Sequence, residues 1–150
     1  TDHPVCMAFT RQAITVYEKA DKDWKNTVRK GAYIVQEGTK NPDITILATG
    51  SEVEMSLNAA KLVSGKNIRV VSVMDKTLFE KQDESFQKEI IGNAKRVVVA
   101  EAGVSFGWEK YKKKKKDLFT IDRFGESGPA AKVAEDLKFT SADLAKVLEN

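Results

Sequence analysis

Short apolar runs that alternate with helical patterns constrain the fold of this chain more than any other feature. From Gly31 onward, such runs cover residues 32–35, 44–49, 68–73, 96–100 and 118–121. Amphipathic segments with helical spacing separate several of these runs, and two more follow the last one. Strands joined by right-handed helical crossovers form parallel sheets with helices on their faces. The sequence therefore predicts an α/β fold, a three-layer α/β/α arrangement around a five-stranded mixed sheet.

One strand of this sheet is expected to be antiparallel. The connection over residues 37–43 contains Gly38, Asn41 and Pro42, which are turn residues. It is too short to hold a crossover helix, so the strands at 32–35 and 44–49 should be antiparallel if they pair. The remaining strands are expected to be parallel.

Helix ends are marked by residues that favour them. Ser51 and Glu54 have the spacing of a capping box at the start of a helix that Gly65 ends. A helix is predicted over 83–91, with Phe86, Ile90 and Ile91 inward, and a short one over 108–111. Pro129 suits the start of a further helix. The last helix is expected to be capped by Thr140 or Ser141, with its inward residues Ala142, Leu144, Ala145 and Leu148.

The first thirty residues differ from the rest. Residues 4–9 are apolar and predict a short buried strand, whereas residues 10–30 are polar and predict a linker with one helical turn around Trp24. We therefore divide the chain into 1–30, the end of an upstream domain plus linker, and 31–150, one domain. Thr1 in place of Met also suggests a chain that once continued upstream.

Charge and composition exclude several classes of protein. The 25 Lys and Arg residues exceed the 22 Asp and Glu residues by three, and the run Lys112–Lys116 alone accounts for this excess. A single cysteine, Cys6, excludes an internal disulfide framework and favours a reducing compartment such as the cytoplasm. A single histidine, His3, excludes a multi-histidine metal site. Apolar runs are too short to span a membrane.

Four candidate groups follow predicted strands, where open parallel sheets bind ligands. They are Gly50 with Ser51, Asp75, Glu101, and Asp122 with Arg123. Gly50 and Ser51 could bind an anion at a helix start, although a tight turn with a helix cap is the favoured interpretation. Glu101 and Asp122 could form a carboxylate pair for acid–base chemistry, although solvated or arginine-paired carboxylates are favoured.

Aromatic and basic residues near position 110 have alternative interpretations. Phe106, Trp108 and Tyr111 could form an aromatic platform, although a cluster that caps the sheet edge is favoured. Lys112–Lys116 could bind nucleic acid, although a solvated loop is favoured, since no nucleic-acid-binding signature accompanies the run. Cys6 is expected to be a buried, inert thiol, and His3 has no visible catalytic partner.

Several segments in order resemble the carboxyl-terminal third of transketolases. Together they cover essentially the whole chain. They are His3-Pro4 leading to Thr10-Arg11-Gln12, Lys30 to Val35, Ile46 to Glu54, Arg69 to Val73, Phe79 to Asp83, Val99 to Gly103, Phe106 to Trp108 and Asp122 to Ala130.

This resemblance implies a function for the full-length protein. Transketolases transfer a two-carbon ketol group between sugar phosphates, with thiamine diphosphate and a divalent metal such as Mg²⁺, usually as cytoplasmic homodimers. The resemblance implies no catalytic, cofactor-binding or metal-binding residue in this portion, which is expected to be an inactive scaffold with dimer contacts. Arg11 matches the family's arginine that binds the substrate phosphate. Thr10 and Gly128 depart from the usual Ser and Ala.

Two other hypotheses remain open from the sequence. The chain could be a free-standing α/β binding or regulatory module that takes a nucleotide or sugar phosphate at the strand ends. It could also bind nucleic acid through Lys112–Lys116, although the expected partners are sugar phosphates and a second subunit, with no nucleic acid or membrane.

Overall fold

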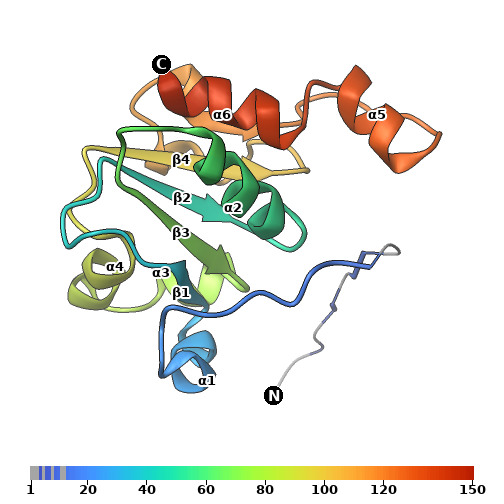
Figure 1. The fold of residues 1–150 in the computed structure, drawn as a ribbon. Helices are drawn as coiled ribbons and strands as arrows, with labels where there is room; N and C mark the ends of the chain where they lie inside the picture. Colours follow the sequence, from blue (N-terminus) through green and yellow to red (C-terminus); the bar gives the residue numbers. More distant parts are fainter. Residues whose placement is uncertain (1–3, 5, 8, 11–12) are drawn as a thin grey trace.

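Helices cover both faces of a mixed β-sheet in the computed structural model of this chain (Figure 1). The structure describes residues 4, 6, 7, 9, 10 and 13–150. Within this part, five strands lie in the order β1-β3-β2-β4-β5. The strands are β1 (Ala32–Gln36), β2 (Ile44–Ala48), β3 (Ile68–Val73), β4 (Arg96–Glu101) and β5 (Leu118–Thr120). The predicted three-layer α/β/α fold is confirmed.

Strand pairing agrees with a mostly parallel sheet that has one antiparallel member. Strands β2, β3, β4 and β5 are parallel, and β1 is antiparallel to β3 at the edge. The sequence considered pairing between β1 and its neighbour along the chain, β2. Instead β3 lies between them, and β1 and β2 run in opposite directions without pairing.

Two apolar clusters fill the spaces between the sheet and its helices. On one face, α2 (Glu52–Leu62) and α6 (Ser141–Glu149) pack together over a cluster that includes Ile46, Val70 and Leu144. On the other face, α3 (Lys76–Glu80) and α4 (Glu84–Ile91) bury Phe79 and Phe86 against residues such as Val71. Alternate strand residues thus face opposite clusters, as the two-residue repeat of a strand requires.

Most helix ends match their predictions. Asp83 caps α4 by accepting the backbone N–H of Phe86 at 2.9 Å, and Gly92 follows its last residue. Thr140 caps α6 through the N–H of Asp143. Ala142 is exposed, so its predicted inward position was wrong, because the buried stripe of α6 starts at Leu144.

Short elements complete the described chain. The predicted turn around Trp24 is α1 (Trp24–Thr27), which continues into the 3-10 helix η1 (Val28–Lys30). Two further 3-10 helices, η2 (Glu109–Tyr111) and η3 (Lys115–Asp117), lie between β4 and β5. Helix α5 (Ala130–Asp136) follows Pro129 and projects from the body of the fold (Figure 1).

The predicted buried strand at residues 4–9 is wrong where the structure describes it. Pro4, Cys6, Met7 and Phe9 are exposed and lie in no strand. Extended backbone needs a partner strand for its hydrogen bonds, and the described sheet has none at this segment. The buried position expected for the Cys6 thiol is wrong for the same reason.

Residues 13–23 lie along the domain, and we call them the strap. The backbone N–H groups of Ala20 and Asp21 donate to the carbonyls of Val35 and Ile34, at 2.9 and 3.1 Å. The pairing of β1 with β3 shifts register between Ile34 and Gln36, in the same stretch whose carbonyls accept both bonds. The strap therefore covers an edge that would otherwise be open to another strand.

Candidate functional site

The predicted site residues gather at one edge of the sheet. Gly50 follows β2, Asp75 follows β3, Glu101 ends β4 and Asp122 follows β5. Because these four strands are parallel, their carboxyl ends meet along the same edge, which we call the carboxyl edge. The opposite side is the amino edge. The sequence thus placed these groups correctly, although it could not predict their partners.

Ser51 and Glu54 do not form the predicted capping box. Ser51 already has helical backbone angles, and its hydroxyl donates to the carboxylate of Glu52 at 2.8 Å. Glu54 instead accepts the backbone N–H of Thr15, at 3.2 Å, and the Thr15 hydroxyl. The capping prediction was wrong because the strap supplies Glu54 with a partner far away in the sequence.

Two carboxylates meet where strands β2 and β4 end. The Thr49 hydroxyl donates to Glu101 at 2.9 Å and lies 3.5 Å from the carboxylate of Glu52. Burial raises the pKa of Glu52, and the nearby charge of Glu101 raises it further. The carboxylates of Glu52 and Glu101 make the start of α2 acidic, and the positive end of the helix dipole already stabilises the Glu52 carboxylate. Phosphate binding at Gly50 and Ser51 is therefore disfavoured.

Glu101 is therefore paired with Glu52 and not with Asp122. Asp122 accepts the backbone N–H of Ser105 at 2.7 Å and the Thr120 hydroxyl at 2.6 Å. The Ser105 N–H and this hydroxyl lower the pKa of Asp122 below its usual range. The carboxylate pair considered from the sequence was wrong, because adjacency in the sheet brings Glu52 to Glu101.

Two more candidates at this edge are held in structural contacts. Arg123, the neighbouring candidate partner for Asp122, donates to Glu126 at 2.7 Å. Asp75 caps α3 by accepting the N–H of Leu78 at 2.8 Å. Both residues therefore have partners within the described chain.

The aromatic residues near position 110 do not form one platform. Trp108 is buried, with its ring centroid 5.9 Å from that of Tyr111 and the ammonium of Lys76 over its ring. Phe106 points to solvent. Trp108 and Tyr111 therefore cap the sheet edge, which is the interpretation the sequence favoured.

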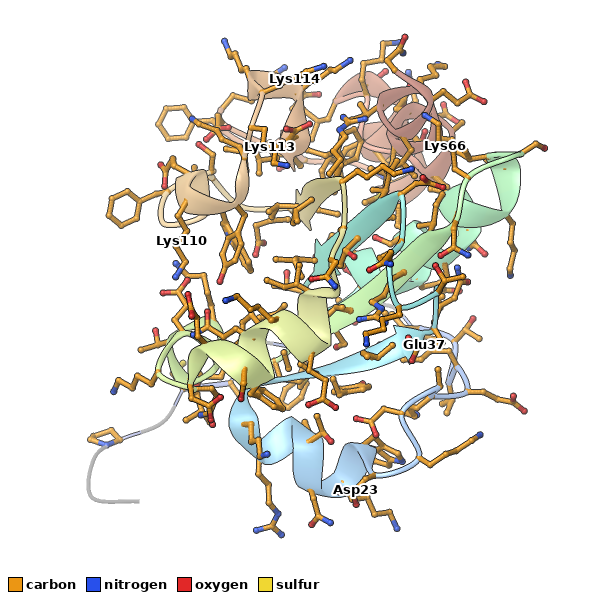
Figure 2. All side chains as sticks on the ribbon, turned by 90° about the vertical axis from the view of Figure 1, so that its left-hand side faces the viewer. Asp23, Glu37, Lys66, Lys110, Lys113 and Lys114 are labelled. Carbon is orange, nitrogen blue, oxygen red and sulfur yellow. The ribbon has the colours of Figure 1, made fainter. Side chains whose placement is uncertain are left out.

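The lysine run is exposed but anchored at the amino edge, which faces the viewer in Figure 2. Asp117 is buried and accepts the backbone N–H groups of Lys113 and Lys114, at 3.0 and 2.7 Å. Its other oxygen accepts a hydrogen bond from the Nε–H of Arg96, on β4, at 2.7 Å. Burial alone would raise the pKa of Asp117, but the Arg96 guanidinium and these N–H groups hold it below its usual range. No pattern in the sequence predicted this contact.

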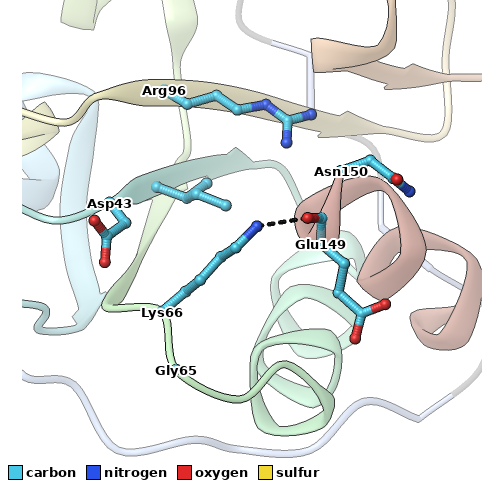
Figure 3. Close-up of a pocket in the computed structure, with 7 residues that line it drawn as sticks. Asp43, Gly65, Lys66, Arg96, Glu149 and Asn150 are labelled. Carbon is cyan, nitrogen blue, oxygen red and sulfur yellow. Dashed lines mark hydrogen bonds between the residues drawn. The ribbon is translucent and has the colours of Figure 1, made fainter.

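Two hollows at the amino edge are lined by charged residues. One, of about 390 Å³, lies between Lys66, Arg96 and the end of α6 (Figure 3). Lys66 donates to the carbonyls of Leu148 and Glu149, at 2.6 and 2.8 Å, and Arg96 donates to that of Val147. These cations satisfy the free carbonyls at the helix C-terminus, where positive charge is favoured.

The second hollow, of about 510 Å³, contains the buried side chain of Arg69. Arg69 donates to the carbonyls of Glu89 and Ile90 at the end of α4, and its guanidinium pairs with Glu37. In each hollow an arginine donates to the carbonyls at the end of a helix. Within the described residues, Arg69 Nε and Arg96 Nη2 are nevertheless buried without a hydrogen-bond partner.

Some candidates lie outside the described residues. Arg11 and His3 are among them, so the structure does not test their predicted roles. Within the described part of the chain, no group of three His, Cys, Asp or Glu side chains has the arrangement of a metal site. No helix in that part is both long and apolar enough to cross a bilayer.

Comparison with known proteins decides the family. Residues 31–140 match the family model described as the transketolase-like TK C-terminal domain. The chain belongs to this family. It is 48% identical to the transketolase of Treponema pallidum over 97% of its own length, but spans only 22% of that relative. The predicted resemblance to transketolases is thereby confirmed.

Solved transketolase structures share the fold. A transketolase mutant from Pichia stipitis superposes with a TM-score of 0.80 at 30% identity, over 93% of this chain and 20% of that chain. The Pichia enzyme in complex with sedoheptulose-7-phosphate gives a TM-score of 0.77 at 31% identity, over 91% and 19%. A split-gene transketolase, described as an inactive β4 tetramer, gives 0.60 at 25% identity, over 81% and 42%.

Proposed function

We propose that this chain is the carboxyl-terminal portion of a thiamine diphosphate-dependent transketolase, which transfers a two-carbon ketol group between sugar phosphates. The observation that carries the proposal is the similarity to a transketolase over 97% of this chain and only 22% of the relative. A match over nearly all of this chain but only 22% of the relative supports the view that the chain is one part of a larger enzyme.

Within that enzyme, this portion serves as a scaffold and not as the reactive centre. Thiamine diphosphate needs groups that hold a diphosphate and a divalent metal, and metal sites of this kind use several oxygen ligands. The described residues do not fit such a site. Glu52 and Glu101 repel a diphosphate at the carboxyl edge, and Asp75 and Asp122 are held in turns. The cofactor and Mg²⁺ are accordingly bound by other parts of the enzyme.

Arg11 is the residue of this chain that acts on the substrate. A guanidinium binds phosphate through paired, charge-assisted hydrogen bonds. The proposal assigns this role to Arg11 because the string Thr10-Arg11-Gln12 resembles the family's phosphate-binding segment. It places residues 1–30 with the end of the preceding domain and its linker, and residues 31–150 in the carboxyl-terminal domain.

The partners of the complete enzyme are sugar phosphates and a second subunit, and its setting is the cytoplasm. The Pichia relative was solved with a sugar phosphate, which supports the first partner. The split-gene relative, described as a β4 tetramer, supports self-association of chains that carry this domain.

A chimeric enzyme tests the proposal. The 150 residues replace the matching portion of the Treponema pallidum transketolase, and ketol transfer is measured with and without thiamine diphosphate and Mg²⁺. We expect an active chimera and no transfer by the isolated chain. Arg11→Gln should raise the KM for a phosphorylated acceptor by about 10- to 100-fold, as the loss of charge-assisted hydrogen bonds predicts. The KM for an unphosphorylated aldose should change much less.

Arg29→Gln is the matched control, since Arg29 is an exposed arginine in the same thirty residues. It should leave both KM values unchanged. Ketol transfer by the isolated chain would contradict the scaffold role, and a folded but inactive chimera would contradict the transketolase assignment. Equal effects of the Arg11 and Arg29 variants would contradict the phosphate-binding role.

A further inference from the structure

The hollow at the end of α6 gathers more positive charge than the helix end requires (Figure 3). Lys66, Arg96 and Lys116 all donate to backbone oxygens in the last turn of α6 and at Asn150, over distances of 2.6 to 2.9 Å. The C-terminal end of a helix carries only about half of one negative charge, whereas each of these side chains carries a full positive charge. One cation would match this helix end, so the presence of three calls for a further reason.

The carboxylates near this hollow are already paired or turned away. Asp117 pairs with Arg96 at 2.7 Å, and Asp43, which lines the hollow, pairs with Lys95 at 2.7 Å. The carboxylate of Glu149 is turned away from Arg96 in Figure 3. Among the described residues, the two lysines that reach α6 therefore have backbone oxygens, and not carboxylate side chains, as their partners.

The cations of this hollow are crowded and not fully engaged. Arg96 lines the hollow, and within the described part of the chain its Nη2 atom is buried without a hydrogen-bond partner. Desolvation lowers the pKa of Lys116 below its ordinary value. Nearby positive charges, those of Lys114, Arg96 and Lys66, lower this pKa further, because they repel the charged form of the amine. A bound anion would relieve the repulsion and supply acceptors for unused N–H donors.

We infer that the hollow at the end of α6 binds a phosphate group, either as inorganic phosphate or as the phosphate of a monoester. Lys66 and Lys116 contact the phosphate oxygens, since a phosphate carries about 1.5 to 2 negative charges at neutral pH and forms charge-assisted hydrogen bonds with cations. The volume of about 390 Å³ is more than ten times the roughly 30 Å³ of a water molecule, which leaves room for a phosphate and part of an attached group. The inference goes beyond the proposed function and does not depend on it, because it uses neither Arg11 nor ketol transfer.

A titration of this chain with phosphate, followed by NMR, tests the inference while chloride keeps the ionic strength constant. The backbone amide signals of Lys116 and Asn150 should shift saturably, with a Kd of about 1 mM or lower. The double variant Lys66→Gln/Lys116→Gln should raise this Kd by about tenfold or more, as the loss of charge-assisted hydrogen bonds predicts.

Parallel titrations distinguish the two sources of the phosphate group. Glucose 6-phosphate should bind more tightly than inorganic phosphate if the ligand is a monoester, and more weakly if the ligand is the free ion. Glucose alone should cause no saturable shift. Binding of glucose as tight as that of its phosphate would overturn the inference.

Both lysines also support α6, so Lys114→Gln is a second variant that removes a nearby charge and leaves the bonds to α6 in place. It should weaken phosphate binding by about two- to fivefold, as the loss of one exposed charge predicts. Lys132→Gln is the matched control, since Lys132 pairs with Asp136 on α5, which projects from the fold (Figure 1). This control and Arg11→Gln should leave the Kd unchanged. The absence of saturable shifts, or an equal weakening in either control, would overturn the inference.

Discussion

Glu52 shows how single residues at this sheet edge depend on neighbours that are distant in the sequence. It is the first residue of α2, where a carboxylate is favoured by the helix dipole. The end of β4 brings Glu101 to the same place, and burial of Glu52 adds to the cost of its charge. The sequence identified Glu101 as a candidate but could not identify Glu52, because only the strand order makes β2 and β4 neighbours.

We expect Glu52→Gln to stabilise the protein at neutral pH by about 1 kcal/mol, because it removes a buried charge beside Glu101. Because the pKa of Glu52 is raised on folding, the folded chain binds its proton more tightly than the unfolded chain does. In the parent protein, the stabilisation that comes from protonated Glu52 is therefore fully present below the ordinary glutamate pKa. It is lost as pH rises through the raised pKa of the folded state. Urea denaturation between pH 4 and 8 measures both effects.

Glu54→Gln is the control for this prediction, since Glu54 lies in the same turn of α2. Its pKa is lowered by the hydroxyl and N–H of Thr15, so its charged form is favoured in the folded chain. The variant should therefore lose stability at neutral pH and approach the parent as pH falls. A stability change in the same direction in both variants would contradict the opposite pKa shifts of Glu52 and Glu54.

Elements depend on each other most clearly where η3 meets β4. Asp117 is buried and joins the lysine run to Arg96, whose guanidinium also reaches the end of α6. The Asp117–Arg96 pair thus links three elements, η3, β4 and α6. The sequence predicted the lysine run as a solvated loop, which holds for its side chains. It could not predict the buried aspartate, because an Asp after five lysines resembles an ordinary surface residue.

We expect Asp117→Ala to reduce the free energy of unfolding by about 3 kcal/mol. Removing one partner of a buried ion pair leaves the other charge without compensation. Here the variant also leaves two backbone N–H groups of the lysine run without their acceptor. Chemical denaturation at pH 7 measures the loss.

Asp136→Ala is the comparison for this prediction. Asp136 pairs with Lys132 on the exposed surface of α5, where an ion pair contributes less than about 1 kcal/mol. A similar loss of stability in both variants would contradict the stabilising role of the buried Asp117–Arg96 ion pair.

At the scale of the whole molecule, the sequence predicted the layers better than the pairing. Apolar runs such as 68–73 and 96–100 are long and clear, so the strands and the flanking helices α2, α4 and α6 were predicted close to their observed positions. The sequence missed α3, which has only five residues, although Asp75 in front of it is a typical N-cap. Periodicity shows which face a residue occupies but not which strands are adjacent, so the position of β1 beside β3 was not predicted.

The strap is a whole-molecule feature whose contribution can be measured by truncation. We expect removal of residues 1–23 to lower Tm by several degrees, because about 1–2 kcal/mol corresponds to such a shift in a domain of this size. The loss combines the two bonds to β1 with the contact of Tyr17 on the core. The uncovered edge should also increase aggregation. Calorimetry and light scattering measure the two effects.

Removal of residues 1–9 is the control, because it leaves the strap in place. This shorter truncation should keep the parent Tm. If the longer truncation also kept it, the strap would lie on the domain without stabilising it.

The two ends of the strap hold on to different parts of the body, Thr15 to helix α2 and Ala20 with Asp21 to the outer strand. A pulling force applied at residue 13 would therefore act first on the contact with α2. It would act on the edge of the sheet only after that contact had broken. When a single molecule is stretched from residue 13, we expect two unfolding steps. The smaller step, in which the contact with α2 breaks, should precede the rupture of the sheet.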